Sequence, residues 1–126
     1  MTARLTRLKT RSEFLRVAAG RVRAVRPGLI RQAAPQPDDG YGALRVGFTA
    51  SRRVGNAVER NRAKRRLRAA AATVLPQHGK AGTDYVLIAR AGTGERPYAE
   101  LLADLEGALR QLARPHSPRA ARGGEE

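Results

Sequence analysis

A nine-residue segment, 60–68, contains six basic residues, and it constrains the fold of this chain more than any other part of the sequence. Asn56 is a favourable helix N-cap, so a helix is expected to start there and to run to about Leu75, before Pro76. Small and apolar side chains recur along one stripe of this helix at 3.6 residues per turn: Ala63, Leu67, Ala70 and Val74. The stripe predicts a helix that packs one side against a sheet and turns its cations outward.

The outward side of this predicted helix is almost purely cationic. Arg60, Lys64 and Arg68 fall on a second stripe, called the basic stripe below. A solvated helix face usually mixes both signs of charge, but Glu59 is the only acid within reach. Side chains at intervals of about 6 Å resemble the phosphate spacing of a nucleic-acid strand, and arginine binds phosphate through two parallel hydrogen bonds. The segment therefore predicts an anionic partner, and nucleic acid in particular.

The overall charge supports the same interpretation. The chain has 25 Lys and Arg against 11 Asp and Glu, a net charge of +14, which attracts nucleic acid or an anionic membrane surface. No run of 18 apolar residues occurs, residues 1–11 lack the apolar region of a signal peptide, and the basic helix lacks bulky apolar residues for interfacial insertion. Cysteine is absent, which excludes disulfides and most zinc sites. We expect a cytoplasmic nucleic-acid-binding protein with no membrane partner.

The first third of the chain predicts one helix and two strand regions. Residues 1–9 are interpreted as a basic arm, and the capping-box spacing of Thr10 and Glu13 predicts a helix that ends at Gly20. Residues 21–32 alternate loosely around an interrupting Pro-Gly pair, which predicts either one kinked strand or two short pieces.

The remaining segments complete a single domain. Turn-forming residues at 33–42 predict a hairpin loop, and alternation at 44–50 predicts a half-buried strand. The apolar run 85–89 predicts a strand covered on both faces, and Pro97 can start a last helix. The order α-β-β-α-β-α describes an α/β (α+β) two-layer sandwich over residues 1–113. Residues 114–126, rich in Pro, Gly and Arg, are expected to be a disordered tail.

The sequence predicts no catalytic residues and no metal site in the protein itself. His78 lies in a turn and His116 in the tail, and neither has a partner at the spacing of a metal site or a catalytic triad. The few acids are scattered, whereas a metal-dependent nuclease needs acids that converge on the basic surface. The pattern favours a protein that assists another catalyst.

Residues 45–68, RVGFTASRRVGNAVERNRAKRRLR, resemble the signature of the bacterial ribonuclease P protein subunit family. The matching positions agree in order and spacing: Val46, Gly47, Ser51, Gly55, Ala57, Val58, Arg60, Asn61, Arg62, Lys64, Arg65 and Arg68. Residues 85–90 and 11–17 resemble the family's next strand and its first helix, so that the resemblance covers roughly residues 4–113.

The resemblance implies a ribosomal-protein-like fold with a left-handed β-α-β crossover around the basic helix, although such crossovers are generally right-handed. It also implies that the protein acts within an endoribonuclease that matures the 5′ end of tRNA. A catalytic RNA subunit would carry out the chemistry with Mg²⁺, which the RNA would mainly hold. The implied partners are that RNA and the 5′ leader of precursor tRNA, with no small-molecule substrate. The protein is expected as a monomer in a 1:1 ribonucleoprotein.

The resemblance also implies two sets of contact residues. The first would bind RNA and consists of Arg52, Arg53, Arg60, Asn61, Arg62, Lys64, Arg65 and Arg68. The second would line a leader-binding cleft between the sheet and the first helix and consists of Phe14, Arg11, Arg31 and Arg45. Two roles stay open, because Phe14 can stack on RNA or pack in the core, and Asn61 can contact RNA or bond locally.

Relatives often carry further aromatic residues at two places in this predicted cleft. Here Ala18 stands one turn after Phe14, and Arg31 or Gln32 occupies the strand position, so leader binding is expected to depend on charge more than on stacking.

Two rival functions remain at the level of the sequence. One is a structural RNA-binding module of ribosomal type with no part in processing. The other is a DNA-binding helix, for which a helix-turn-helix or a dimer seam is expected and neither is visible.

Overall fold

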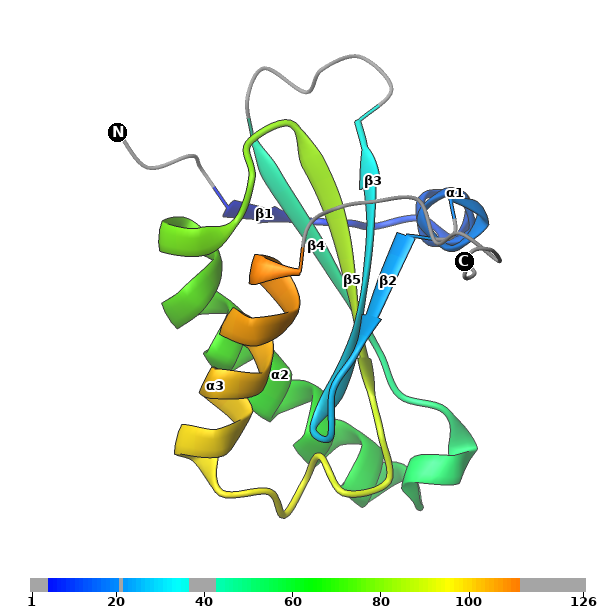
Figure 1. Ribbon diagram of the computed structural model, residues 1–126. Coiled ribbons are helices and arrows are strands. Elements are labelled where there is room, and N and C mark those ends of the chain that lie inside the picture. The colour runs from blue at the N-terminus through cyan, green and yellow to red at the C-terminus, as the bar shows by residue number, and fades with distance from the viewer. Residues whose placement is uncertain (1–4, 21, 37–42, 112–126) are drawn as a thin grey trace, which may run out of the picture.

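The computed structural model describes residues 5–20, 22–36 and 43–111. A five-stranded mixed sheet forms the centre of the molecule, in the order β1-β4-β5-β3-β2 (Figure 1). The pairs β1–β4 and β4–β5 are parallel, and the pairs β5–β3 and β3–β2 are antiparallel. The elements in chain order are β1 (Leu5–Arg7), α1 (Arg11–Ala19), β2 (Val22–Val25), β3 (Leu29–Pro35), β4 (Leu44–Thr49), the 3₁₀ helix η2 (Arg52–Val54), α2 (Ala57–His78), β5 (Thr83–Ala89) and α3 (Tyr98–Arg110).

The main core lies between one face of the sheet and helices α2 and α3. The four residues of the predicted stripe, Ala63, Leu67, Ala70 and Val74, are all buried there, which confirms the helical winding. Strand β5 lies between β4 and β3, and all of its residues except Ile88 are buried. The strand is thus covered on both faces, as its continuous apolar run predicts.

Helix α1 covers part of the opposite sheet face (Figure 1). Its Val17 packs in a second, smaller cluster with Leu8, Ala34 and Val86. The predicted capping box is present, because the Thr10 hydroxyl accepts from the Glu13 N–H at 3.3 Å and Glu13 Oε1 accepts from the Thr10 N–H at 2.9 Å. The mixed α/β class is confirmed, with α1 as an additional layer over part of the sheet.

Residues 21–32 form two strands, so the second of the two alternatives is confirmed. Pro27 and Gly28 form the two-residue loop of a hairpin between these strands. Two hydrogen bonds close the loop: the Arg26 N–H donates to the Leu29 carbonyl at 2.9 Å, and the Leu29 N–H donates to the Arg26 carbonyl at 3.3 Å. The expected hairpin at 33–42 is wrong, because β5 lies between β3 and β4, and those strands do not pair. Residues 37–42 of that segment and the predicted tail, 114–126, lie outside the described residues.

Two further element boundaries differ from the sequence prediction. Part of the predicted basic arm is strand β1, which pairs with β4 and also extends the sheet beside α2. Helix α2 continues past Pro76 to His78. Proline removes only one N–H in this last turn, and the Gly79 N–H still bonds the Leu75 carbonyl at 2.8 Å.

The Glu13 carboxylate makes the first turn of α1 sensitive to pH. Backbone hydrogen bonds from Thr10 and then Lys9, together with the positive charge of Arg45, hold the pKa of Glu13 below its usual value of 4.5. A carboxyl with a lowered pKa in the folded state stabilises the fold above its unfolded pKa and loses that contribution as pH falls through the folded pKa. In Glu13→Gln, we expect a loss of unfolding free energy that is present near neutral pH and shrinks below about pH 4.5. Urea denaturation across this range measures it, and a loss that is the same at every pH would contradict the account.

Candidate nucleic-acid interface

Helix α2 presents its basic residues on the side away from the main core. Asn61, Arg62 and Arg65 are exposed, and the basic stripe residues Arg60, Lys64 and Arg68 are half-buried. The ion pairs among the described residues use none of these side chains. Arg60 Nε is buried and has no hydrogen-bond partner among the described residues. This surface therefore carries several cations that form no ion pair with the residues that the structure describes.

Asn61 lies among these cations with its amide in solvent. The cap of α2 is provided by another residue, Asn56, whose side chain accepts from the Glu59 N–H at 2.9 Å. The Glu59 carboxylate in turn accepts from the Asn56 N–H at 2.8 Å, so this acid next to Arg60 stabilises the helix start. Asn56, and not Asn61, therefore caps the helix, and a contact between Asn61 and RNA stays a prediction.

The remaining basic residue of the segment 60–68, Arg66, has a structural role. Its guanidinium donates to the carbonyls of Thr93 at 3.2 Å, Gly94 at 2.8 Å and Arg96 at 2.5 Å. It also lies 6.0 Å from the centre of the Tyr98 ring. Arg66 therefore holds the loop between β5 and α3 against α2. The sequence alone does not reveal this role, because the loop is distant from Arg66 along the chain.

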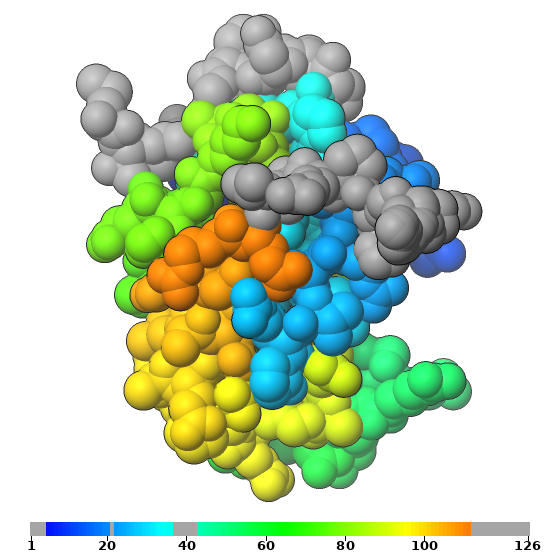
Figure 2. Space-filling view, in the orientation of Figure 1, coloured from blue at the N-terminus to red at the C-terminus, as the bar shows by residue number. Residues whose placement is uncertain are grey.

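Helix η2 places two more predicted contacts just before α2. Arg52 and Arg53 are exposed, and the Ser51 hydroxyl accepts from the Arg53 N–H at 3.3 Å. Gly55 connects η2 to α2 with φ of 146°, a backbone conformation that favours glycine. The segment around η2 projects from the body of the molecule (Figure 2), so these arginines extend the cationic surface of α2.

The predicted leader cleft lies on the other sheet face, beside α1. Phe14 is half-buried and packs against the smaller cluster, with its ring against β4 at Gly47. A methyl group added to Gly47 would lie 2.4 Å from two ring atoms of Phe14. Phe14 is therefore part of the packing, and its partial exposure leaves the stacking interpretation open. Arg11 is exposed at the first position of α1.

This contact gives a direct test of how α1 sits on the sheet. We expect Gly47→Ala to lower the free energy of unfolding by about 1–3 kcal/mol, the usual cost of overpacking. In a Phe14→Leu background the same change should cost less, because the smaller side chain leaves room for the methyl group. Urea denaturation of the four proteins in this cycle measures the coupling. Equal costs of Gly47→Ala in both backgrounds would show that Phe14 does not rest on Gly47.

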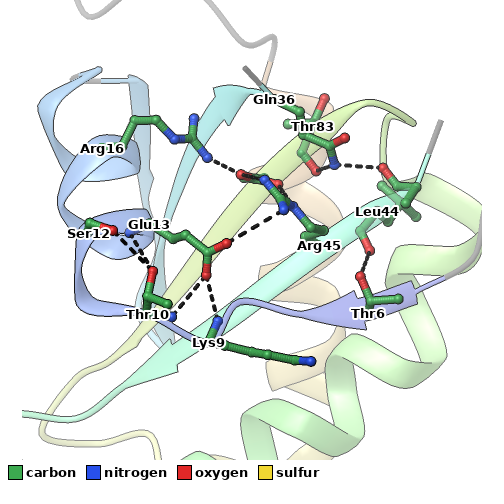
Figure 3. Close-up of polar contacts among 12 residues, drawn as sticks. Thr6, Lys9, Thr10, Ser12, Glu13, Arg16, Gln36, Leu44, Arg45 and Thr83 are labelled. Carbon is green, nitrogen blue, oxygen red and sulfur yellow. Dashed lines mark hydrogen bonds and ion pairs between the residues drawn. The ribbon is translucent and has the colours of Figure 1, made fainter. Parts of the chain in front are cut away.

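Arg45 lies in the predicted cleft region but is engaged within the protein. Its guanidinium binds the fully buried Asp84 side chain through two hydrogen bonds, Nε to Oδ1 at 2.7 Å and the terminal nitrogen to Oδ2 at 2.8 Å. Arg16 of α1 donates to the same carboxylate and also to the Pro35 carbonyl at 2.9 Å. Figure 3 shows Arg16 and Arg45 converging from α1 and β4. The cluster ties α1 to the sheet, and sequence reasoning missed Asp84 altogether.

The expected position of Arg31 beside Phe14 is wrong. Arg31 pairs across the sheet with Ala24 and Leu87, which both belong to the main core, so its side chain lies on the face covered by α2 and α3. It is 2% exposed, and its guanidinium donates to the Gln111 carbonyl at 3.3 Å. Burial lowers the pKa of this guanidinium from its usual value, with a smaller opposing effect from Tyr85. Arg31 is therefore a buried residue near the end of α3.

Another set of sheet residues, absent from the predicted cleft, lies on the α1 side of the sheet where Arg31 was expected. Thr49, Ile88, Ile30 and Val25 are direct neighbours on β4, β5, β3 and β2. Ile88 packs against the cluster that contains Val17 of α1, which places this row on the α1 face. The first three are half-buried and Val25 is 50% exposed. We call this set the open row. It contains no aromatic ring on which a base could stack.

Neither a metal centre nor a membrane-spanning helix is found in the part of the chain that the structure describes. Over residues 5–20, 22–36 and 43–111, no three His, Cys, Asp or Glu side chains lie together in a way that could hold a metal ion. The described helices include none that is long and apolar enough to cross a membrane.

Comparison with known proteins gives a consistent result. The sequence profile of a family described as Ribonuclease P matches residues 2–113. A ribonuclease P protein component from Paramagnetospirillum magneticum is 55% identical over 123 residues, which are 96% of this chain and 92% of that protein. Another from Caulobacter vibrioides is 48% identical over 112 residues, which are 89% of this chain and 74% of that protein.

Solved structures show the same fold. The RNase P protein from Thermotoga maritima matches with a TM-score of 0.71 at 21% identity, over 84% of this chain and 96% of that chain. The RNase P protein from Staphylococcus aureus matches with a TM-score of 0.69 at 23% identity, over 86% and 97%.

Proposed function

The chain belongs to the ribonuclease P protein family, and from its two surfaces we propose that it helps a catalytic RNA to remove the 5′ leader from precursor tRNA. The observation that carries this proposal is the cationic surface of η2 and α2, which lies opposite the buried stripe of α2. Its side chains form no ion pair within residues 5–20, 22–36 and 43–111. Such a surface fits a dense array of phosphates, as a folded RNA presents. We propose that it binds the catalytic RNA subunit through Arg52, Arg53, Arg60, Asn61, Arg62, Lys64, Arg65 and Arg68.

The second surface is proposed to bind the leader. Arg11, Phe14 and the open row lie on the α1 side of the sheet, whereas α2 covers the other face. Separate faces allow one protein to contact two RNA segments at once. Since Arg31 faces the main core and Arg45 is bound to Asp84, we assign neither a direct contact with the leader.

We also propose how the protein and the RNA share the reaction. Because the described residues supply no group of metal ligands, we propose that Mg²⁺ is held mainly by the RNA and that no protein side chain takes part in bond cleavage. The protein would bind the RNA, position the leader and reduce charge repulsion between the two RNAs. We propose a cytoplasmic 1:1 complex with a monomeric protein.

Reconstitution with a bacterial ribonuclease P RNA tests the proposal. At low Mg²⁺, the purified protein should increase cleavage of a leader-bearing precursor tRNA at the mature 5′ end and lower the Mg²⁺ concentration that cleavage requires. Gel analysis of the 5′ product across a Mg²⁺ series measures both effects. Binding to the RNA without any gain in cleavage would instead support the rival function, a structural module of ribosomal type.

A further inference from the structure

A pocket lies between the edge strand β1, strand β4 and the second half of α2, on the sheet face opposite α1. Its volume is about 190 Å³, below the roughly 300–1,000 Å³ of drug-sized ligand sites. Val46 and Ala71, each 1% exposed, lie at its base together with half-buried Phe48. The space is thus suited to one flat, mostly apolar group.

Two arginine side chains border this apolar space. Arg7 comes from β1 and lies 5.6 Å from the centre of the Phe48 ring, while Arg68 comes from α2. An arginine beside an aromatic ring offers a surface on which planar groups stack. Arg68 is also the last residue of the basic stripe, so the pocket is continuous with the cationic surface of α2.

A small apolar space bordered by arginines fits a ligand with a flat ring and a neighbouring negative charge. An apolar peptide side chain would gain nothing from the two guanidinium groups, and a free phosphate would gain nothing from Val46, Phe48 and Ala71. A nucleotide with an unstacked base matches both parts. The source is the catalytic RNA, because the sheet separates the pocket from the α1 side where the leader is proposed to bind.

We propose that this pocket receives one unstacked nucleobase of the catalytic RNA subunit, with the adjoining phosphates on Arg7 and Arg68. The inference rests on the proposed function, because it requires that α2 binds this RNA. It adds a shape-dependent contact to an interface that otherwise depends on charge. Such a contact recognises an unstacked nucleotide of the folded RNA, whereas phosphate contacts position the protein but carry no sequence information.

The test fills the pocket without changing any charge. Ala72 lines the pocket and is exposed on α2, so Ala72→Leu occupies the space and keeps a good helix former. We expect the affinity for the ribonuclease P RNA to fall by roughly 5- to 150-fold, the range for one stacked base, with the salt dependence of binding unchanged. Ala103→Leu, at an exposed position of α3, is the matched control and should bind like the wild type.

The outcomes separate this inference from the proposed function. If wild-type protein does not bind the RNA or stimulate cleavage, the proposed function fails. If the wild type does both and Ala72→Leu binds within twofold of it, the pocket assignment alone is overturned. Urea denaturation of Ala72→Leu shows that the variant is folded, so that a loss of affinity is not a loss of structure.

A second measurement locates the base directly. The chain has no cysteine, so Ala72→Cys supplies a single thiol for an iron chelate that generates hydroxyl radicals. Cleavage of the RNA subunit at one short cluster of nucleotides, absent when the probe is at Ala103→Cys, is the expected result. Cleavage confined to the leader of the precursor, or no focused cleavage, would overturn the assignment.

Discussion

Replacing Asp84 with alanine is expected to lower the free energy of unfolding by about 3 kcal/mol. Asp84 is fully buried and accepts hydrogen bonds from both Arg16 and Arg45, so its removal leaves two guanidinium groups without their common partner. Breaking a buried ion pair by removing one partner typically costs about 3–5 kcal/mol. We expect the lower end of this energy range because the side chains of Arg16 and Arg45 are 32% and 27% exposed, so water can solvate them when Asp84 is absent.

Urea denaturation of Asp84→Ala measures this loss, and Glu100→Ala is its control. Glu100 pairs with Arg96 at 3.3 Å, but its side chain is 57% exposed, so its removal should cost about 1 kcal/mol or less. Because the Asp84 cluster joins α1 to the sheet, the variant should also lose selectivity for leader-bearing substrate more than affinity for the RNA subunit. An Asp84→Ala protein as stable as Glu100→Ala would contradict this account of how α1 is held.

Replacing Arg60, Lys64 and Arg68 together with alanine is expected to weaken binding to the ribonuclease P RNA on the order of 100-fold near physiological salt. Each lost phosphate contact reduces the slope of log affinity against log salt by about 0.7–1, so the slope should fall by about 2–3. The three side chains form one stripe on α2, and none takes part in an ion pair among the described residues. Their removal should therefore leave the fold intact.

The matched control removes the same amount of charge elsewhere. Lys9, Lys80 and Arg110 are exposed and lie outside η2 and α2, so their replacement with alanine lowers the net charge equally. If the RNA binds to the basic stripe in particular, the control variant should keep most of the wild-type slope of log affinity against log salt. Equal losses in the two triple variants would mean that overall charge, and not the basic stripe, drives binding.

The parts of the fold that local sequence determines were predicted correctly. The buried stripe of α2 follows from a helical period and a cap that lie within one segment, and the same is true of the capping box at Thr10. Strand β1 escaped prediction because three residues carry no measurable alternation, and its pairing with β4 is a tertiary contact. The position of β5 between β3 and β4 also depends on long-range pairing that no local pattern contains.

The cleft was harder to predict because it depends on which way each strand residue faces. The Pro27–Gly28 loop separates two short strands, so the alternation of side chains between the two sheet faces does not continue from one strand to the next. The pattern across 21–32 therefore gives the wrong face for Arg31. Asp84 directly precedes the apolar run 85–89, so this run alone predicts too late a start for β5. An acid at that position, beside an arginine on a neighbouring strand, is the signal that could have revealed the cluster.

We propose that this protein gives the catalytic RNA a means to recognise the 5′ leader. The most direct measurement compares the affinity for a leader-bearing precursor tRNA with that for the mature tRNA, using the RNA alone and the RNA with protein. With protein, the ratio of the two affinities should rise by about tenfold, which corresponds to about 1.4 kcal/mol of leader binding. A ratio that is the same with and without the protein would contradict the account.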